Sequence, residues 1–188
     1  TSTTFVAALA AFYHRIPVGH IEAGLRTGQK YSPWPEEINR KLTSDLADLH
    51  FAPTDLAREN LLREGISPEN IYVTGNTVID ALLATVKKEY EFADQNLNRI
   101  LNANKDKRLI LLTTHRRENL GEPMRQTYQA LAQILAEHPD TYVIFPVHKN
   151  PAVRKVVAEV LEHRQRVYLI EPLDYEPFVN LMARAYLV

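Results

Sequence analysis

Short apolar runs alternate along the chain with longer stretches in which apolar residues recur at helical spacing. In the first part, the predicted strands are residues 17–21, 50–52 and 71–74. The predicted helices are residues 3–14, a helix that begins at Pro35, residues 55–64, and a helix from residue 77 into the 80s. The second of these helices places Ile38, Leu42 and Leu46 on one face.

Residues 87–107 are polar and charged, with four asparagines after Gln95, and this composition predicts an interdomain linker. The pattern then restarts, with strands at residues 109–113, 142–147, 167–170 and from 186 onward, and helices at 124–137, 152–162 and 177–185. Strands that alternate with helices indicate parallel sheets covered on both faces. The chain is therefore expected to be α/β, with parts of two Rossmann-like domains at residues 1–86 and 108–188.

Composition narrows the functional classes. The 188 residues carry 22 Lys+Arg against 23 Asp+Glu, so there is no overall basic field to hold nucleic acid or an anionic membrane. The longest apolar run, residues 5–13, is too short to span a bilayer, and the first residues lack the basic start of a secretory signal. Without cysteine there is no disulfide, thiolate zinc site or cysteine nucleophile. These features fit a cytoplasmic enzyme or binding protein.

Both ends of the sequence predict an internal fragment of a larger protein. Thr1 lies inside the first predicted helix, and the last three residues are an apolar run without a following turn. The only methionines are Met124 and Met182.

Polar residues follow five of the predicted strands. They are Glu22, Gly75-Asn76, residues 115–119, residues 148–150, and Glu171 with Asp174. Ligands of open parallel sheets bind at the carboxyl ends of the strands. Because two of these segments begin with histidine and one holds adjacent arginines, the pattern favours a cleft for an anionic ligand.

Each candidate residue also has a structural interpretation. Arg116 and Arg117 suit phosphate beside a helix N-terminus, or are surface partners of nearby glutamates. His148 is a ligand contact or a satisfied structural histidine. Glu22 and Glu36 serve as acid/base groups if their pKa values are raised; otherwise they are a loop acid and a helix-start charge. No metal-ligand spacing, Gly-x-Gly-x-x-Gly or Gly-x-Ser-x-Gly motif is present.

Longer motifs are more specific. They are GHIEAGLRT (19–27), SPWPEEINR (32–40), FAPT (51–54), VTGNTVID (73–80), THRRENLG (114–121) and PVHKNP (146–151). Over nearly its whole length the chain closely resembles the bacterial non-hydrolysing UDP-N-acetylglucosamine 2-epimerases. The resemblance implies a GT-B fold, with a UDP-sugar in the central cleft that the parallel sheets of two Rossmann-like halves face. Residues 1–86 then correspond to the C-terminal part of the first half, and residues 108–188 to the N-terminal part of the second.

The resemblance also implies an activity. UDP-N-acetylglucosamine and UDP-N-acetylmannosamine are interconverted by elimination of UDP, which gives a 2-acetamidoglucal, and by its re-addition to the opposite face. The expected protein is a cytoplasmic homodimeric isomerase for cell-surface polysaccharide synthesis, without a metal or nicotinamide cofactor. Glu22 and Glu36 are the implied acid/base groups, His115 is a catalytic residue beside the diphosphate, and Phe178 lies near the uracil.

In relatives with a second, regulatory UDP-N-acetylglucosamine, residues that match Glu36, Arg116 and His148 help to form that allosteric site. The sequence also departs from the family pattern. The family's acid/base aspartate would precede Thr1, its Thr-Asp-Ser-Gly-Gly segment would follow Val188, and Leu173 stands where some members have glutamine. The 188 residues alone are therefore expected to turn over substrate poorly or not at all.

Three other functions remain as alternatives. A hydrolysing relative would release free N-acetylmannosamine and UDP, although the intact PEEINR stretch (35–40) resembles the non-hydrolysing branch. A glycosyltransferase shares the expected fold but not these motifs. A non-catalytic sugar-nucleotide-binding module suits the 188 residues taken alone.

Overall fold

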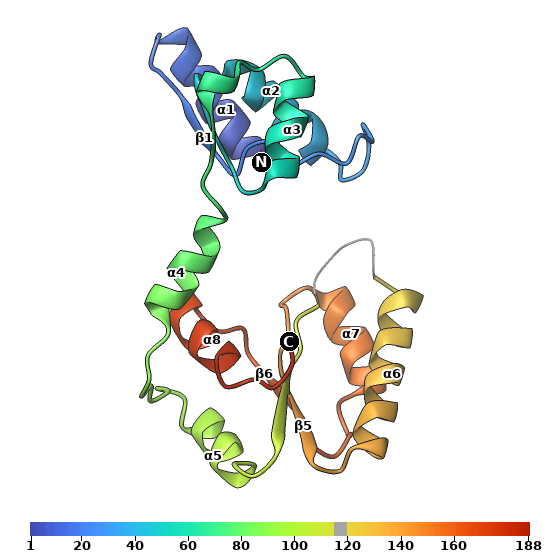
Figure 1. Ribbon diagram of the computed structural model, residues 1–188. Helices are drawn as coiled ribbons and strands as arrows, with labels where there is room; N and C mark the ends of the chain where they lie inside the picture. Colours follow the sequence, from blue (N-terminus) through green and yellow to red (C-terminus); the bar gives the residue numbers. More distant parts are fainter. Residues whose placement is uncertain (115–119) are drawn as a thin grey trace. The chain divides into compact units, whose positions relative to one another are not determined.

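The computed structural model describes residues 1–114 and 120–188, and the chain forms two compact units, Thr1–Leu83 and Ala84–Val188 (Figure 1). Each unit holds a sheet of three parallel strands, whose order follows the sequence. Helices alternate with the strands in both units. The predicted α/β fold class is therefore confirmed.

The sheet of the first unit has the order β1-β2-β3. Its strands are β1 (Gly19–Ile21), β2 (Leu49–Ala52) and β3 (Ile71–Val73). The helices are α1 (Ser2–Tyr13), α2 (Glu36–Leu46) and α3 (Asp55–Arg63), and a short 3-10 helix, η1 (Pro68–Asn70), precedes β3. A further helix, α4 (Thr77–Thr85), begins in the first unit and ends in the second.

Small side chains allow α3 to pack closely in the first unit. The apolar cluster there consists of Ala23, Ala52, Ala57, Leu61 and Ile71. Gly24 has a φ of +85°, and a Cβ at this position would lie 2.1 Å from the carbonyl oxygen of Ala57. Only glycine fits such a close approach of the loop after β1 to α3.

The buried side of α2 differs from the face that apolar spacing picks out. Leu42 is exposed and Ile38 and Leu46 are half-buried, whereas Glu37, Thr43 and Ser44 are buried. The two hydroxyls donate to main-chain carbonyls one turn earlier, at 2.7 and 3.1 Å, and so keep their hydrogen bonds inside the protein. A helix can bury a polar side when each polar group has a partner.

The sheet of the second unit has the order β4-β5-β6. Its strands are β4 (Arg108–Leu111), β5 (Thr141–Pro146) and β6 (Val167–Ile170). The helices are α5 (Gln95–Ala103), α6 (Glu122–Glu137), α7 (Pro151–Val160) and α8 (Tyr175–Met182). Beyond α8, the strand expected from residue 186 is reduced to one parallel bridge between Leu187 and Ile110.

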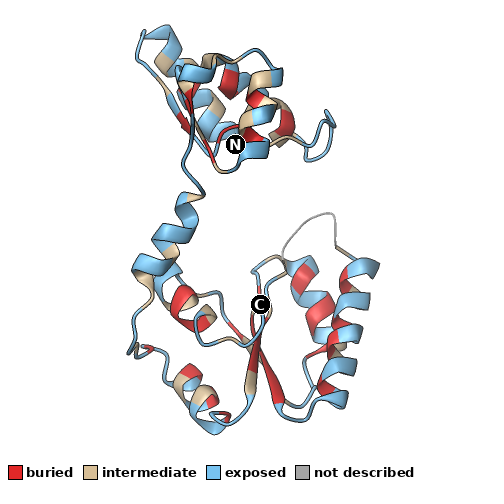
Figure 2. Cartoon of the chain, in the orientation of Figure 1, coloured by how far each residue is buried: buried red, intermediate tan, exposed pale blue. Residues whose placement is uncertain are grey.

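Both faces of this second sheet are packed. Along β5, Val143 and Phe145 belong to one apolar cluster, with residues of α6 and α7. Tyr142 and Ile144 belong to another, with residues of α5 and α8. Successive side chains of a strand point to opposite faces, so one buried strand supplies both cores. Figure 2 shows the resulting buried stripes on β5, α6 and α7.

Residues 87–107, predicted as a linker, are part of the second unit. They contain α5, whose Leu97 and Ile100 are buried in the same cluster as Phe92. Asp94 caps this helix by accepting the main-chain N–H of Asn96 at 2.8 Å. Some of the polar residues that suggested a linker are the cap and the solvent-facing side of this amphipathic helix, whereas Asn104 is buried and donates to the carbonyl of Ile100 and the hydroxyl of Tyr168. In the described part of the chain, no helix has the length and apolar character needed to cross a membrane.

Candidate active site

Glu22 stands immediately after β1, where the chain turns sharply. Its φ is +62°, in the left-handed region that non-glycine residues rarely adopt. Glu22 lines a small pocket of about 160 Å³ together with His20, Asn39 and Arg40. The pocket therefore joins the end of β1 to α2, and α1 contributes to its wall.

His20, another lining residue of this pocket, is almost completely buried. Burial, followed by the neighbouring His50 and by Arg26, lowers its pKa to about 4. The imidazole is therefore neutral at pH 7 and adds no positive charge beside Glu22.

Glu36 lies in the first turn of α2 and is half-buried. A carboxylate is favoured there by the N-terminal end of the helix dipole. Asn39 and Arg40, which line the Glu22 pocket, are three and four residues further on and so share its side of the helix. Both predicted acid/base residues thus belong to the first unit, and Glu36 is one turn away from the Glu22 pocket.

Glu37 holds the loop after Glu22 against the start of α2. Its side chain is 1% exposed, and its carboxylate accepts the main-chain N–H of Thr27 at 3.1 Å and that of Gly28 at 2.9 Å. A buried charge is stable only when it is paired or hydrogen-bonded in this way. From the sequence, Glu37 was only one of two acidic residues at a helix start, and the resemblance that singled out Glu36 gave Glu37 no role.

Arg26 connects the same loop to the C-terminal end of α3, where Glu64 is the C-cap residue. Its almost fully buried guanidinium donates to Glu64 at 2.7 and 2.9 Å and to the hydroxyl of Ser44 at 2.9 Å. Burial alone would raise the pKa of Glu64, but the hydrogen bond and charge of Arg26, together with Lys41, outweigh it and lower that pKa. The loop that follows Glu22 is thereby held from both α2 and α3.

The remaining described candidates belong to the second unit. His148 follows β5, and its Nδ1 accepts the main-chain N–H of Asn150 at 3.1 Å. Asn150 in turn caps α7 by accepting the N–H of Ala152 at 2.9 Å, so His148 stands at a helix N-terminus. Phe178 is a half-buried residue of α8 that packs against the cluster on the α5 and α8 side of the sheet. His115 and Arg116 lie outside the described residues.

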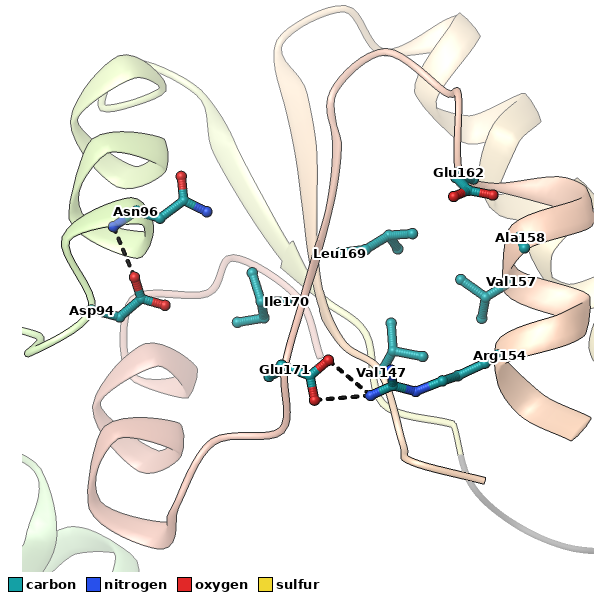
Figure 3. A pocket seen from close by; sticks show the side chains of 10 residues that line it. All are labelled: Asp94, Asn96, Val147, Arg154, Val157, Ala158, Glu162, Leu169, Ile170 and Glu171. Atoms are coloured by element: carbon teal, nitrogen blue, oxygen red, sulfur yellow. Dashed lines mark hydrogen bonds and ion pairs between the residues drawn. The ribbon is translucent and has the colours of Figure 1, made fainter. Parts of the chain in front are cut away.

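A larger pocket of about 510 Å³ lies beside β6, an edge strand of the second sheet (Figure 3). Its lining residues are Asp94, Asn96, Val147, Arg154, Val157, Ala158, Glu162, Leu169, Ile170 and Glu171. Arg154 is 2.8 Å from both carboxylate oxygens of Glu171, so its charge is already neutralised within the pocket. The volume of this pocket therefore does not make it the better site for an anionic ligand. Among the described residues, no group of three or more His, Asp or Glu could hold a metal ion.

All 188 residues match the family model described as UDP-N-acetylglucosamine 2-epimerase. This chain belongs to that family. It is 50% identical to the UDP-N-acetylglucosamine 2-epimerase of Bacillus subtilis (strain 168), over 100% of the chain and 48% of that protein. The enzyme of that name from Salmonella typhimurium is 53% identical over 195 aligned residues, which are 100% of the chain and 51% of that protein. The chain thus spans about half the length of these relatives.

Solved structures of epimerases agree with the fold. The S. aureus MnaA–UDP co-structure superposes with a TM-score of 0.91 at 48% identity, over 99% of this chain and 49% of that one. The UDP-GlcNAc 2-epimerase from Neisseria meningitidis bound to UDP-GlcNAc gives a TM-score of 0.86 at 46% identity, over 98% and 50%. The family resemblance and the GT-B fold type inferred from the motifs are therefore confirmed.

Proposed function

We propose that the full-length protein that carries this chain interconverts UDP-N-acetylglucosamine and UDP-N-acetylmannosamine without net hydrolysis. The observation that carries the proposal is the placement of two carboxylates in the first unit. Glu22 lies in the pocket, Glu36 lies one helical turn away, and the loop between them is fixed by Glu37 and Arg26. Two positioned carboxylates suit a reaction in which a proton leaves a carbon and returns on its other face.

In the proposed reaction, one carboxylate takes the proton from C2 of the sugar. The C1–O bond breaks, and UDP departs with the bonding electrons, which leaves a 2-acetamidoglucal. The other carboxylate then returns a proton to the opposite face of C2 while UDP re-adds at C1. No water is consumed, and the sugar nucleotide is regenerated as its epimer.

The family resemblance supports further assignments, which we include in the proposal. His115 stands beside the diphosphate, and Phe178 lies near the uracil. Glu36, Arg116 and His148 belong to a second, regulatory UDP-N-acetylglucosamine site in a cytoplasmic homodimer that serves polysaccharide synthesis. Support for the substrate class comes from the solved relatives, which are described as holding UDP or UDP-GlcNAc.

Turnover in deuterium oxide tests the reaction. The expected product is UDP-N-acetylmannosamine that carries deuterium at C2, with UDP still attached. Release of free N-acetylmannosamine and UDP would support the hydrolysing reaction instead. If the full-length protein bound UDP-N-acetylglucosamine without any exchange at C2, it would be a binding module. For the 188-residue chain alone we expect binding at most, and epimerisation at an ordinary enzymatic rate would contradict this expectation.

A further inference from the structure

Two buried histidines lie side by side in the sheet of the first unit. His20 of β1 and His50 of β2 are direct partners in the parallel register, and they are 8% and 1% exposed. In each ring, Nδ1 is buried and has no hydrogen-bond partner among the described residues. Buried polar atoms usually have partners, so both rings need an explanation.

The other ring nitrogen distinguishes the two residues. Nε2 of His50 is 3.0 Å from the carbonyl oxygen of Ser44, and a carbonyl can only accept, so His50 carries its proton on Nε2. His20 has no such bond within the described part of the chain. It lines the pocket that contains Glu22, and also a neighbouring cavity of about 500 Å³ that is bounded by α1. Since Nδ1 of His20 is shielded, Nε2 is the ring nitrogen available to a ligand.

The same burial favours one tautomer of His20. A buried acceptor without a partner is less unfavourable than a buried N–H without one. The neutral ring should therefore leave Nδ1 unprotonated and carry its proton on Nε2, as a hydrogen-bond donor to the pocket. Its neutrality follows from its burial and from its cationic neighbour Arg26.

We propose that His20 is a ligand-contacting residue of the Glu22 pocket, where its Nε2–H donates a hydrogen bond to an oxygen substituent of the bound sugar. This inference rests on the proposed function, because it takes the sugar to occupy the pocket of the carboxylate that moves its proton. A neutral donor orients such an oxygen without adding a charge next to that carboxylate. Phosphate oxygens are better served by cations, so the sugar is the expected partner of a neutral imidazole.

The kinetic test uses the full-length enzyme with His20→Asn and His20→Gln. The amide nitrogen of glutamine reaches about as far as Nε2, whereas that of asparagine reaches only as far as Nδ1. We expect His20→Asn to lower kcat/KM for UDP-N-acetylglucosamine about tenfold, the worth of one neutral hydrogen bond, and to leave the Kd for UDP unchanged. His20→Gln should restore most of the loss. His50→Asn is the matched control, because it removes the neighbouring buried ring, which does not line the pocket, and should leave kcat/KM unchanged while lowering Tm.

A spectroscopic test covers the case in which a variant does not fold. Long-range ¹H–¹⁵N correlation spectra of the wild-type enzyme identify the tautomer of each histidine. UDP-N-acetylglucosamine should shift the Nε2 signal of His20, and UDP alone should leave it in place. A wild-type kcat/KM in folded His20→Asn, or a His20 signal that the sugar nucleotide does not move, would overturn the inference. Failure of the wild type to exchange the C2 proton would instead refute the proposed function.

Discussion

The two units build the same parallel α/β arrangement with different interiors. In the second unit, large apolar side chains pack both faces of the sheet. In the first unit, the apolar cluster is small, and the buried set includes His20, His50 and Glu37. Larger apolar side chains of its strands are exposed instead, such as Ile21 at 59% and Tyr72 at 49%.

This difference indicates what holds each unit together. The stability of the second unit comes mainly from the close packing of apolar side chains, and such packing is insensitive to pH. The first unit depends more on directional bonds, from Glu37 to the main chain and from Arg26 to Glu64. A hydrogen-bonded polar interior holds functional side chains in a fixed geometry. However, loss of one partner leaves a buried polar group without a hydrogen bond, which destabilises the fold. Four predictions test this comparison.

The largest effect is expected at the two carboxylates of the first unit. In the full-length enzyme, Glu22→Gln and Glu36→Gln should each lower kcat by about 10²–10⁴-fold, because a glutamine cannot exchange a proton with C2. The Kd for UDP, measured by calorimetry, should change little. Glu59→Gln on α3, whose Arg63 partner is 3.5 Å away at the surface, is the control and should retain full turnover. Wild-type turnover in either test variant would show that its acid/base assignment is wrong.

In the second unit the largest effect should come from lost volume. Phe145 is fully buried on β5, with its ring 5.8 Å from that of Tyr128. Phe145→Ala should lower the free energy of unfolding of this unit by about 3–5 kcal/mol, through lost burial and a residual cavity. Urea unfolding followed by hydrogen exchange of the 188-residue chain measures the loss, with Phe145→Leu as the milder control. If Phe145→Ala lowered the hydrogen-exchange protection of the first unit as much as that of the second, the two units would not have independent cores.

Sequence patterns predicted the fold well where apolar spacing and burial coincide. β6 has the predicted bounds, and β5 and α6 differ from prediction only at their ends. The prediction was wrong for residues 87–107, because α5 has few apolar positions and most of its residues face solvent. Composition over a segment cannot show that two side chains, Leu97 and Ile100, anchor it in a core.

The candidate site was predictable only where a residue belongs to a motif. Glu22 and Glu36 could be singled out in this way, whereas His20 and Arg26 belong to the motif of Glu22 without having been assigned a role. Glu37 is chemically identical to Glu36 and adjacent to it, so only the fold reveals which of the two is buried against Thr27 and Gly28. The role of a buried polar residue depends on contacts with residues distant in the sequence, and the spacing of residues within a motif does not predict such contacts.

Glu37 and Glu36 provide a matched pair for the next prediction. Glu37→Gln places an amide NH₂ among the N–H donors of Thr27 and Gly28, so it should destabilise the first unit by about 1–3 kcal/mol. Glu36→Gln, in the same helical turn, should leave stability nearly unchanged while turnover falls. Thermal unfolding of the 188-residue chain, followed through its single tryptophan, Trp34, in the segment between Gly28 and Glu37, measures the difference. Identical unfolding of Glu37→Gln and wild type would show that the hydrogen bonds from Thr27 and Gly28 to Glu37 do not contribute to the stability of the first unit.

The smallest expected effect is a difference in acid sensitivity. The pKa of His20 is about 4 in the folded chain and about 6.5 when unfolded, so between these values the unfolded state binds more protons. The stabilisation from neutral His20 is complete above pH 6.5 and is lost as the pH falls towards 4. Glu64 has a folded pKa lowered from 4.5, so the stabilisation from its ionised carboxylate is present above that value and is lost only as the pH falls below it.

The buried titratable groups described in the second unit do not change charge in that window. Burial raises the pKa of Tyr128 and of Tyr142 above the usual value of 10. On going from pH 7 to pH 5, the melting temperature of the first unit should therefore fall by more than that of the second, as followed by amide NMR signals assigned to each. His20→Gln removes the titrating ring and should reduce this difference. If the variant kept the full difference, a group other than His20 would have to cause the acid sensitivity of the first unit.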